Sequence, residues 1–331
     1  MLKKALIIGI TGQDGLFLTQ LLLQNNYKVM GLTTSLNGDR AIRFKQLFPQ
    51  VKLLEGNLLH AESIEKALKE SKPDEVYNLG GLSNVHQTRN QMELTINING
   101  QGAVRLFETI LKLGIADRIK IYQASTSELF GWTQESPQNE KTPLAPRNPY
   151  GISKALAHFA AENYRKNYGM NISIGILYNH ESSLRGTEYV TRKISSSLAA
   201  IKYGKMKFFE IGDLDSKRDW GFAGDYVEAI WKMTANGFSE NFVIATGVLH
   251  SVRDLINIAI HHAGLQGEAE DYVRINSTFI SQAEKVPLVG NFSKAFELLE
   301  WSPKTNFNFL VKKMMEYDLS LQSGQTKNPL E

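Results

Sequence analysis

The stretch KKALIIGITGQDG, residues 3–15, joins an apolar run to a turn that contains three glycines. The continuous apolar run is typical of a parallel strand that is buried on both faces. Glycine permits a tight turn and lets backbone N–H groups approach a pyrophosphate, and a helix that begins there adds a partial positive charge. The spacing is G-x-x-G-x-x-G rather than G-x-G-x-x-G, yet its position between the first strand and the first helix predicts a dinucleotide-binding turn.

Strand-like and helix-like patterns alternate through the first half of the chain. We therefore predict an α/β fold, a Rossmann-type doubly wound parallel sheet with right-handed crossovers. After the first strand, the expected strands are YKVMGL (27–32), VKLLEGN (51–57), DEVYNLGG (74–81), IKIYQAS (119–125) and NISIGILYN (171–179). The expected helices span residues 15–25, 61–71, 91–113 and 149–168.

The last of these helices has marked boundaries. Asn148 is the expected N-cap, Pro149 suits the first helical position and Gly169 can end the helix. Beyond residue 179 the pattern breaks into shorter pieces. We expect residues 1–178, with parts of 215–250, to bind the dinucleotide. A smaller C-terminal α/β region, formed by residues 179–214 and 251–331, is expected to bind the substrate.

The composition excludes several classes of protein. The 331 residues are 42% hydrophobic, which is enough for a sizeable core. The formal net charge of +3 comes without basic or acidic blocks, so nothing indicates a nucleic-acid partner. The absence of cysteine excludes disulfides, cysteine-rich zinc sites and thiol nucleophiles. The first apolar run is too short for a membrane span and lacks a cleavage site, so we expect a cytoplasmic protein with no membrane partner.

The end of the second strand bears on the form of the cofactor. An NAD-binding fold usually places Asp or Glu there to meet the ribose 2′-hydroxyl. This chain has Thr33, Thr34 and Ser35 instead. These hydroxyls, together with Arg40, can meet a 2′-phosphate. The pattern favours NADP, with NAD as the alternative.

A tyrosine and a lysine follow the fifth strand at the spacing of one helix face. Tyr150 and Lys154 are four residues apart, and an ammonium near a phenol favours the phenolate, so Tyr150 can act as a base. Ser125, Thr126 and Ser127 lie at the strand exit, where a hydroxyl can hydrogen-bond the reacting oxygen. The alternative is a core tyrosine beside a surface lysine, with the hydroxyls and the adjacent glutamate acting only as a turn and cap.

At this point the chain resembles the GDP-mannose 4,6-dehydratases, a family of extended short-chain dehydrogenase/reductases within the epimerase/dehydratase superfamily. The resemblance runs from residue 9 to about residue 253, with weaker matches in AEKVPLVG and WSPKTNF. The segments that carry it are GITGQDG, PDEVYNL, YQASTSELFG, RNPYGISK, NHES, VTRKI, RDWG, VIATG and SVR.

The resemblance implies a hydro-lyase that acts on a GDP-hexose, with GDP-mannose as the first choice of substrate. Tyr150 would take the C4 hydroxyl proton while hydride leaves C4 for the nicotinamide, and Thr126 would hold the C4 oxygen. Glu128 would remove the C5 proton and help the C6 hydroxyl depart, after which the hydride returns to C6. Lys154 would lower the pKa of Tyr150 and hold the nicotinamide ribose.

The resemblance also implies two sets of binding residues and no metal site; His180 is expected to meet the nicotinamide. The expected cofactor contacts are Gly9, Thr11, Gly12, Gln13, Asp14, Gly15, Thr34, Arg40, Asn57, Leu58, Leu79, Gly81, Ser83, Tyr150, Lys154, His180 and Arg185. The expected substrate contacts are Ser83, Thr126, Ser127, Glu128, Asn179, Glu181, Val190, Lys193, Arg218 and Glu284. For Arg218, the alternative is a surface ion pair with Asp215 or Asp219.

The chain departs from the family pattern in its recognition residues. An arginine pair that usually follows the second strand, and that contributes to NADP binding and tetramers, is replaced by Thr-Thr-Ser. The usual AAQSHV is GGLSNV at residues 80–85, and Ser281 stands where the family has an arginine. GDP-N-acetylglucosamine and a GDP-heptose therefore remain alternative substrates.

Other functions also remain open. UDP-glucuronate decarboxylases share the Thr-Ser-Glu sequence. An epimerase or 4-keto reductase would need Tyr150 and Lys154 but no base such as Glu128, and a non-catalytic nucleotide sensor would not need the full set of Thr126, Glu128, Tyr150 and Lys154. We expect a homodimer or homotetramer that is joined by the helices at residues 91–113 and 149–168.

Overall fold

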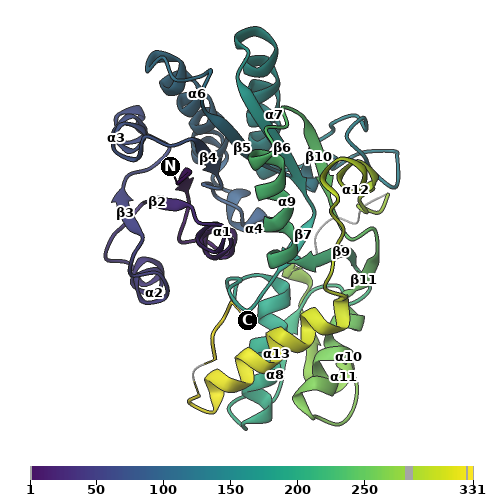
Figure 1. Ribbon diagram of the computed structural model, residues 1–331. Helices are drawn as coiled ribbons and strands as arrows, with labels where there is room; N and C mark the ends of the chain where they lie inside the picture. Colours follow the sequence, from purple (N-terminus) through teal and green to yellow (C-terminus); the bar gives the residue numbers. More distant parts are fainter. Residues whose placement is uncertain (1, 280–285, 326, 331) are drawn as a thin grey trace.

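The protein is described by a computed structural model that covers residues 2–279, 286–325 and 327–330 (Figure 1). Ser281 and Glu284 lie outside the described residues. The central element is a seven-stranded sheet of order β10-β6-β5-β4-β1-β2-β3, in which all neighbouring strands are parallel. Its strands are β1 (Lys4–Ile8), β2 (Lys28–Thr33), β3 (Lys52–Glu55), β4 (Glu75–Asn78), β5 (Lys120–Thr126), β6 (Asn171–Leu177) and β10 (Asn241–Ile244). The predicted doubly wound parallel sheet is confirmed.

Helices cover both faces of this sheet, which explains why all residues of β1 after Lys4 are apolar. Ala5 and Ile7 of β1 pack into one buried cluster, whereas Leu6 and Ile8 pack into another on the opposite face. The first cluster includes residues of α1 (Gln13–Gln24), α2 (Asp39–Leu47), α9 (Ala223–Ala235) and α12 (Ser293–Leu299). The second includes residues of α3 (Ala61–Ser71), α6 (Gly102–Lys112) and α7 (Pro149–Tyr168).

The helix predicted at residues 91–113 is present, but its middle is wider than an α-helix. It runs through α5 (Met92–Thr95), the π-helical segment η1 (Ile96–Gln101) and α6. Gly100 lies where η1 meets α7, and a Cβ there would come within 2.6 Å of Leu156. The glycine therefore allows the two helices to approach closely.

The last predicted helix has the expected boundaries. The side chain of Asn148 accepts a hydrogen bond from the Gly151 N–H at 2.8 Å, Pro149 is the first helical residue, and Gly169 ends the helix with φ of +64°. This cap fixes the position of the first turn of α7, which carries Tyr150.

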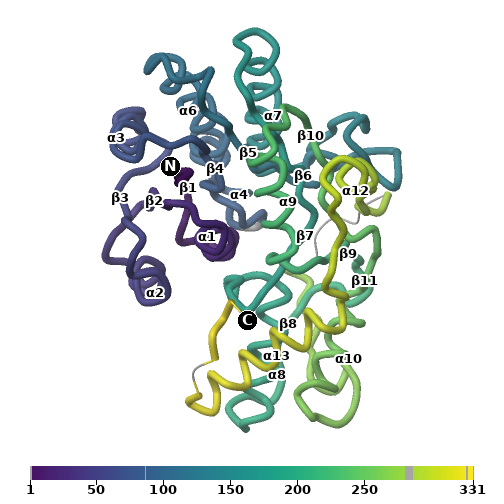
Figure 2. Tube along the Cα trace, in the orientation of Figure 1, coloured from purple at the N-terminus to yellow at the C-terminus, as the bar shows by residue number. Residues whose placement is uncertain are grey.

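The second half of the chain adds smaller sheets. A three-stranded sheet contains β7 (Asn179–Glu181), β9 (Lys217–Phe222) and β11 (Leu249–Ser251), and β8 (Phe209–Ile211) pairs with β12 (Val273–Ile275). The strands β7, β8, β9 and β11 lie below β5 and β6 in the view of Figure 2. A third buried cluster joins α8 (Val190–Lys202), α10 (Val252–Ala263) and α13 (Phe307–Gln322). The remaining short elements are α4 (Val85–Thr88), η2 (Ser127–Leu129), α11 (Ala269–Tyr272) and η3 (Ser277–Phe279).

None of the helices in the described ranges has the length and apolar character needed to cross a membrane.

Candidate functional site

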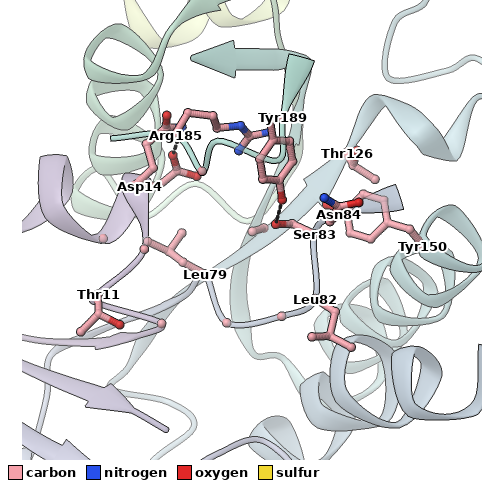
Figure 3. Close-up of a pocket in the computed structure, with 18 of the residues that line it drawn as sticks. Thr11, Asp14, Leu79, Leu82, Ser83, Asn84, Thr126, Tyr150, Arg185 and Tyr189 are labelled. Carbon is pink, nitrogen blue, oxygen red and sulfur yellow. Dashed lines mark hydrogen bonds between the residues drawn. The ribbon is translucent and has the colours of Figure 1, made fainter. Parts of the chain in front are cut away.

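A cleft of about 1050 Å³ lies at the carboxyl ends of the central strands. β1 and β4 are neighbours in the sheet, and the strand order reverses between them because β2 and β3 lie on one side while β4, β5 and β6 lie on the other. Ligands of open α/β sheets bind at such a switch point. Thr11 after β1, Leu79 after β4 and Thr126 at the end of β5 all line this cleft (Figure 3).

The glycine turn forms one wall, and two of its glycines have no space for a side chain. Gly9 has φ of +82°, and a Cβ there would lie 2.9 Å from the backbone of Gly80. A Cβ on Gly15 would lie 2.3 Å from the Ile10 carbonyl oxygen. Gly12 is the N-cap of α1, and no side chain of a described residue caps this helix end. A bare helix N-terminus behind a close backbone turn is suited to a pyrophosphate, so the residues present fit a dinucleotide.

Hydroxyls and arginines line the wall at the end of β2. The hydroxyl groups of Thr11 and Thr33 lie 3.3 Å apart, and Thr34 follows them along the wall. Arg40 and Arg43, both from α2, also line this part of the cleft. Neither α2 nor Arg43 was predicted from the sequence.

The exit of β5 combines a turn with a reactive surface. The Thr126 hydroxyl oxygen accepts a hydrogen bond from the Glu128 N–H at 3.3 Å, which is the turn-and-cap contact considered above. Thr126, Ser127 and Glu128 nevertheless line the cleft together with Tyr150 and Lys154. Thr126 can therefore cap the turn and also contact a ligand in the cleft, because its hydroxyl oxygen accepts from the Glu128 N–H while its O–H remains able to donate.

The electrostatics of the tyrosine and the lysine are governed by burial. Burial raises the pKa of Tyr150 well above its usual value, the Tyr189 phenol acts in the same direction, and a hydrogen bond with Thr126 opposes them. Burial lowers the pKa of Lys154 to about 8. The Lys154 Nζ donates to the Ala124 carbonyl oxygen at 3.1 Å and lies 5.9 Å from the centroid of the Tyr150 ring. The expected lowering of the Tyr150 pKa is thus outweighed by desolvation in this structure.

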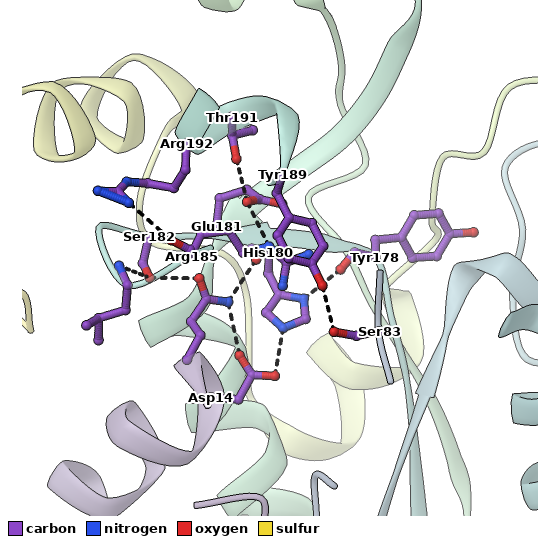
Figure 4. A network of polar contacts seen from close by, with 12 residues as sticks. Asp14, Ser83, Tyr178, His180, Glu181, Ser182, Arg185, Tyr189, Thr191 and Arg192 are labelled. Atoms are coloured by element: carbon purple, nitrogen blue, oxygen red, sulfur yellow. Dashed lines mark hydrogen bonds and ion pairs between the residues drawn. The ribbon is translucent and has the colours of Figure 1, made fainter. Parts of the chain in front are cut away.

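His180 is held by two protein partners (Figure 4). One ring nitrogen lies 2.9 Å from the Asp14 carboxylate, the other lies 2.8 Å from the Tyr178 carbonyl oxygen, and the ring stacks on Tyr226. The ion pair with Asp14 outweighs burial and raises the pKa of His180. In the described parts of the chain, no group of three His, Asp or Glu side chains could hold a metal ion.

A second group of side chains spans the cleft from the other wall. The Arg185 guanidinium lies 3.8 Å from the centroid of the Tyr189 ring and 3.2 Å from the buried Glu181 carboxylate, which also accepts from the Thr191 hydroxyl. The Tyr189 hydroxyl lies 2.7 Å from the Ser83 hydroxyl, across the cleft (Figures 3 and 4). Arg185 is thereby fixed from both sides.

The loop that carries Ser83 is anchored from below. The Asn99 side chain accepts from the Leu82 N–H at 2.8 Å and donates to the Leu82 carbonyl oxygen at 2.9 Å and to the Ser153 hydroxyl at 3.1 Å. Asn99 belongs to η1, so the π-helical segment positions this side of the cleft. No sequence pattern indicated Asn99 or Tyr189, because both act through contacts with residues distant in the chain.

Nearly all predicted site residues come together. Every expected cofactor residue lines the cleft, and so do the expected substrate residues Ser83, Thr126, Ser127, Glu128, Asn179 and Val190. Among the described residues, Glu181, Lys193 and Arg218 do not line it. Glu284 falls outside the described residues.

The three residues that do not line the cleft have other surroundings. Glu181 is buried behind Arg185, and the Lys193 ammonium lies 4.1 Å from the centroid of the Phe279 ring. Arg218 lies in β9 and donates to the Lys217 carbonyl oxygen at 2.7 Å.

Comparison with known proteins gives consistent results. A family model described as GDP-mannose 4,6 dehydratase matches residues 6–314. The GDP-mannose 4,6 dehydratase of Cricetulus griseus is 41% identical over 96% of this chain and 92% of its own length, and that of Homo sapiens is 40% identical over 96% and 91%. The GDP-mannose 4,6-dehydratase of Vibrio cholerae is 38% identical over 97% and 95%.

Solved structures with lower identity share the fold. The dTDP-glucose 4,6-dehydratase of Bacillus anthracis, in complex with NAD, has a TM-score of 0.82 at 22% identity and covers 99% of this chain and 100% of its own. RMD of Pseudomonas aeruginosa, complexed with NADPH, has a TM-score of 0.80 at 19% identity and covers 96% and 98%.

Proposed function

The chain belongs to the GDP-mannose 4,6-dehydratase family, and from this premise we propose that it is a hydro-lyase that converts GDP-mannose to the GDP-4-keto-6-deoxy sugar. The observation that carries the proposal is the meeting of Thr126, Glu128 and Tyr150 in the cleft that the glycine turn also lines. An epimerase or a 4-keto reductase would need the tyrosine but no carboxylate at the position of Glu128.

The cofactor we propose is NADP, held by the glycine turn and, at its adenosine end, by Thr34 and Arg40. When bound, the nicotinamide supplies a reversible hydride acceptor, which takes hydride from C4 of the sugar and returns it to C6. Lys154 and His180 line the cleft where the nicotinamide ribose would lie.

Tyr150 and Thr126 act on the C4 oxygen in the first step. Tyr150 accepts the proton of the C4 hydroxyl as the C4–H bond breaks, and the Thr126 hydroxyl donates a hydrogen bond to the oxygen that becomes the ketone. Burial raises the pKa of the Tyr150 phenol, so a neighbouring positive charge is needed for the phenol to lose its proton. The cationic form of Lys154 supplies this charge, which favours the phenolate.

Glu128 acts in the second step. The new C4 ketone acidifies the C5–H bond, and Glu128 takes this proton. The C6 hydroxyl then leaves, and the same proton passes from Glu128 to it, which releases water and forms the C5–C6 double bond. After hydride reaches C6, C5 takes up a proton that exchanges with solvent. Tyr150 releases the proton that it accepted from the C4 hydroxyl to the same solvent-exchangeable protons.

The GDP end of the substrate is assigned to residues on the second wall. We propose that Asn179 and Val190 contact the nucleotide, whereas Arg185, whose guanidinium is held in place by Glu181 and Tyr189, contacts the cofactor. For Lys193 and Arg218 the proposed contact with GDP requires side chains that turn toward the cleft when the nucleotide binds. Glu181 is better suited to positioning Arg185 than to touching the sugar.

A change of hexose is a second candidate that one observation favours. The Ser83 hydroxyl is already hydrogen-bonded to the Tyr189 hydroxyl. Ser83 belongs to the segment GGLSNV, where the chain departs from the family pattern. A different set of hydroxyls at this point would suit GDP-N-acetylglucosamine or a GDP-heptose.

The chain is also proposed to form at least a dimer. Ile152, Leu156 and Phe159 form an exposed apolar stripe along α7, and Met92 and Leu94 are exposed on the neighbouring α5. Residues at this spacing share one helix face, and two copies of such a helix pair can bury their stripes in a four-helix contact. An apolar face of this kind is typical of a protein–protein interface.

Incubation with a panel of GDP-sugars tests the proposed activity. We expect the mass spectrum to show loss of one water from GDP-mannose, with no net reduction of NADP. Loss of water from GDP-N-acetylglucosamine or a GDP-heptose alone would establish the second candidate. A change of configuration without loss of mass, or net oxidation of NADPH, would overturn the proposal in favour of an epimerase or a reductase.

A further inference from the structure

We propose that Arg43 is a specificity-determining residue that, with Arg40, binds the 2′-phosphate of NADP and so discriminates against NAD. The inference rests on the proposed function, in which the cleft holds a nicotinamide dinucleotide. It adds a residue that the sequence pattern after β2 did not indicate, on a helix that was not predicted.

Arg43 has the location that such a contact requires. It lines the cleft from α2, the helix that follows β2, and the carboxyl end of β2 is where this fold meets the adenosine ribose. Thr33 and Thr34 at that strand end provide hydroxyls but no carboxylate. Arg40 precedes Arg43 by three residues, so the two guanidinium groups share one helix face, and both line the cleft.

The guanidinium of Arg43 is half-buried, and one of its N–H groups lacks a hydrogen-bond acceptor among the described residues. Its Nε is buried, and no described residue accepts a hydrogen bond from it. Burial lowers the pKa of Arg43, with the phenol of Tyr317 opposing that effect and the charges of Arg40 and Arg192 adding to it. Buried donors without an acceptor are costly, so a ligand that provides an acceptor gains affinity there.

The surrounding charges favour an anion. Arg192 is neutralised by Asp318, whose carboxylate it contacts through both Nε at 3.2 Å and Nη2 at 2.5 Å. No described carboxylate forms an ion pair with Arg43, and two like charges at a three-residue spacing destabilise a helix. A phosphate dianion between Arg40 and Arg43 would remove that repulsion, and guanidinium groups match phosphate oxygens in pairs.

Asp39, a described residue near the end of β2, argues for NAD. It lines the cleft at the first turn of α2 and could accept from ribose hydroxyls. Its carboxylate would repel a 2′-phosphate, so the relative weight of Asp39 and the two arginines decides the preference. We expect the arginines to dominate because they carry two charges against one.

Calorimetric titration of the full-length protein with NADP, NAD and 2′,5′-ADP tests this assignment without measuring turnover. We expect wild type to bind NADP at least roughly ten-fold more tightly than NAD. Arg43→Met should weaken binding of NADP and 2′,5′-ADP by roughly ten- to a hundred-fold and leave NAD binding unchanged. Arg43→Lys should be intermediate, because it keeps the charge without the fork. Arg118→Met, an exposed arginine away from the cleft, is the matched control and should change neither.

The possible failures are distinguishable. If wild type prefers NADP but Arg43→Met keeps that preference, Arg43 is not the contact while the proposed cofactor stands. If Arg43→Met weakens NADP and NAD equally, the residue acts on the shared part of the dinucleotide or on the fold, and the assignment is wrong. If wild type prefers NAD, both the assignment and the proposed NADP cofactor are overturned, whereas the dehydration proposal remains to be judged by its own product.

Discussion

The side-chain amide of Asn148 donates a hydrogen bond to the Glu128 carboxylate at 2.6 Å. The other end of the same amide caps α7 by accepting from the Gly151 N–H. One residue thus ties the proposed C5 base to the start of the helix that carries Tyr150 and Lys154. This side chain therefore links the two proposed proton acceptors, Glu128 and Tyr150.

Replacing Asn148 separates its two roles. Asn148→Asp should retain the helix cap, because aspartate is an equally good N-cap. It places a second carboxylate against Glu128, and two adjoining carboxylates share a proton. We expect dehydration at neutral pH to fall by roughly ten- to a hundred-fold and to recover as pH rises. Asn148→Ser, which can cap the helix without adding a carboxylate, is the control. Equal pH profiles for Asn148→Asp and wild type would show that the amide does not act on Glu128.

Lys154 should reduce the stability of the protein when the cleft holds no nucleotide. Its pKa is 10.5 in the unfolded chain and about 8 when buried, so the unfolded state binds more protons between these values and stability rises with pH across that interval. The difference corresponds to roughly 3 kcal/mol at neutral pH. The Lys154→Met variant should be inactive. Urea unfolding should nevertheless give it a higher free energy of unfolding than wild type at about pH 7 and a nearly equal one at about pH 10.5. A less stable variant at pH 7 would contradict the buried-charge account.

The Asp14–His180 pair should stabilise the fold within a defined pH range. The pKa of His180 is raised above 6.5, so its contribution is complete below 6.5 and is lost as pH rises through the folded value. The pKa of Asp14 is lowered below 3.8, so its contribution is lost only in stronger acid. The stability difference between wild type and His180→Asn should be larger at about pH 5.5 than at about pH 9. A difference that does not vary with pH would mean that His180 is neutral in the folded protein.

The proposed dimer predicts an asymmetry between two exposed phenylalanines. Phe159 on α7 is 56% exposed and Phe296 on α12 is 60% exposed. Phe159→Asp would bury an unpaired charge in the proposed contact and should weaken association by at least about a hundred-fold. Phe296→Asp should leave association unchanged. Light scattering at micromolar concentration would measure both, and a wild-type monomer would reject the dimer.

The parts of the fold that sequence could predict are those with local causes. The glycines of the first turn are required by close backbone contacts at Gly9 and Gly15, and the limits of α7 follow from Asn148 and Gly169. The α2 helix was missed because its polar sequence follows a stretch of turn-forming residues that begins at Ser35.

The parts of the site that sequence could not predict depend on contacts between distant residues. Asp14 and His180 are 166 positions apart, and Ser83 and Tyr189 are 106 apart. Nothing local to Glu181 shows that its carboxylate is buried behind Arg185. Likewise, the spacing of Tyr150 and Lys154 places them on one helix face but does not reveal that burial sets the direction of both pKa changes.

Glu128→Gln tests the central claim most directly, because it keeps the size of the side chain and removes the base. With the preferred GDP-sugar in deuterated solvent, wild type should give a dehydrated product that carries solvent deuterium at C5. The variant should form dehydrated product roughly a hundred- to ten-thousand-fold more slowly and show slow or partial reduction of NADP, since Tyr150 and Lys154 can still act at C4. Tyr150→Phe should show neither product nor reduction. Dehydration by Glu128→Gln at a rate near that of wild type would contradict the account, and the exit of β5 would then be a turn alone.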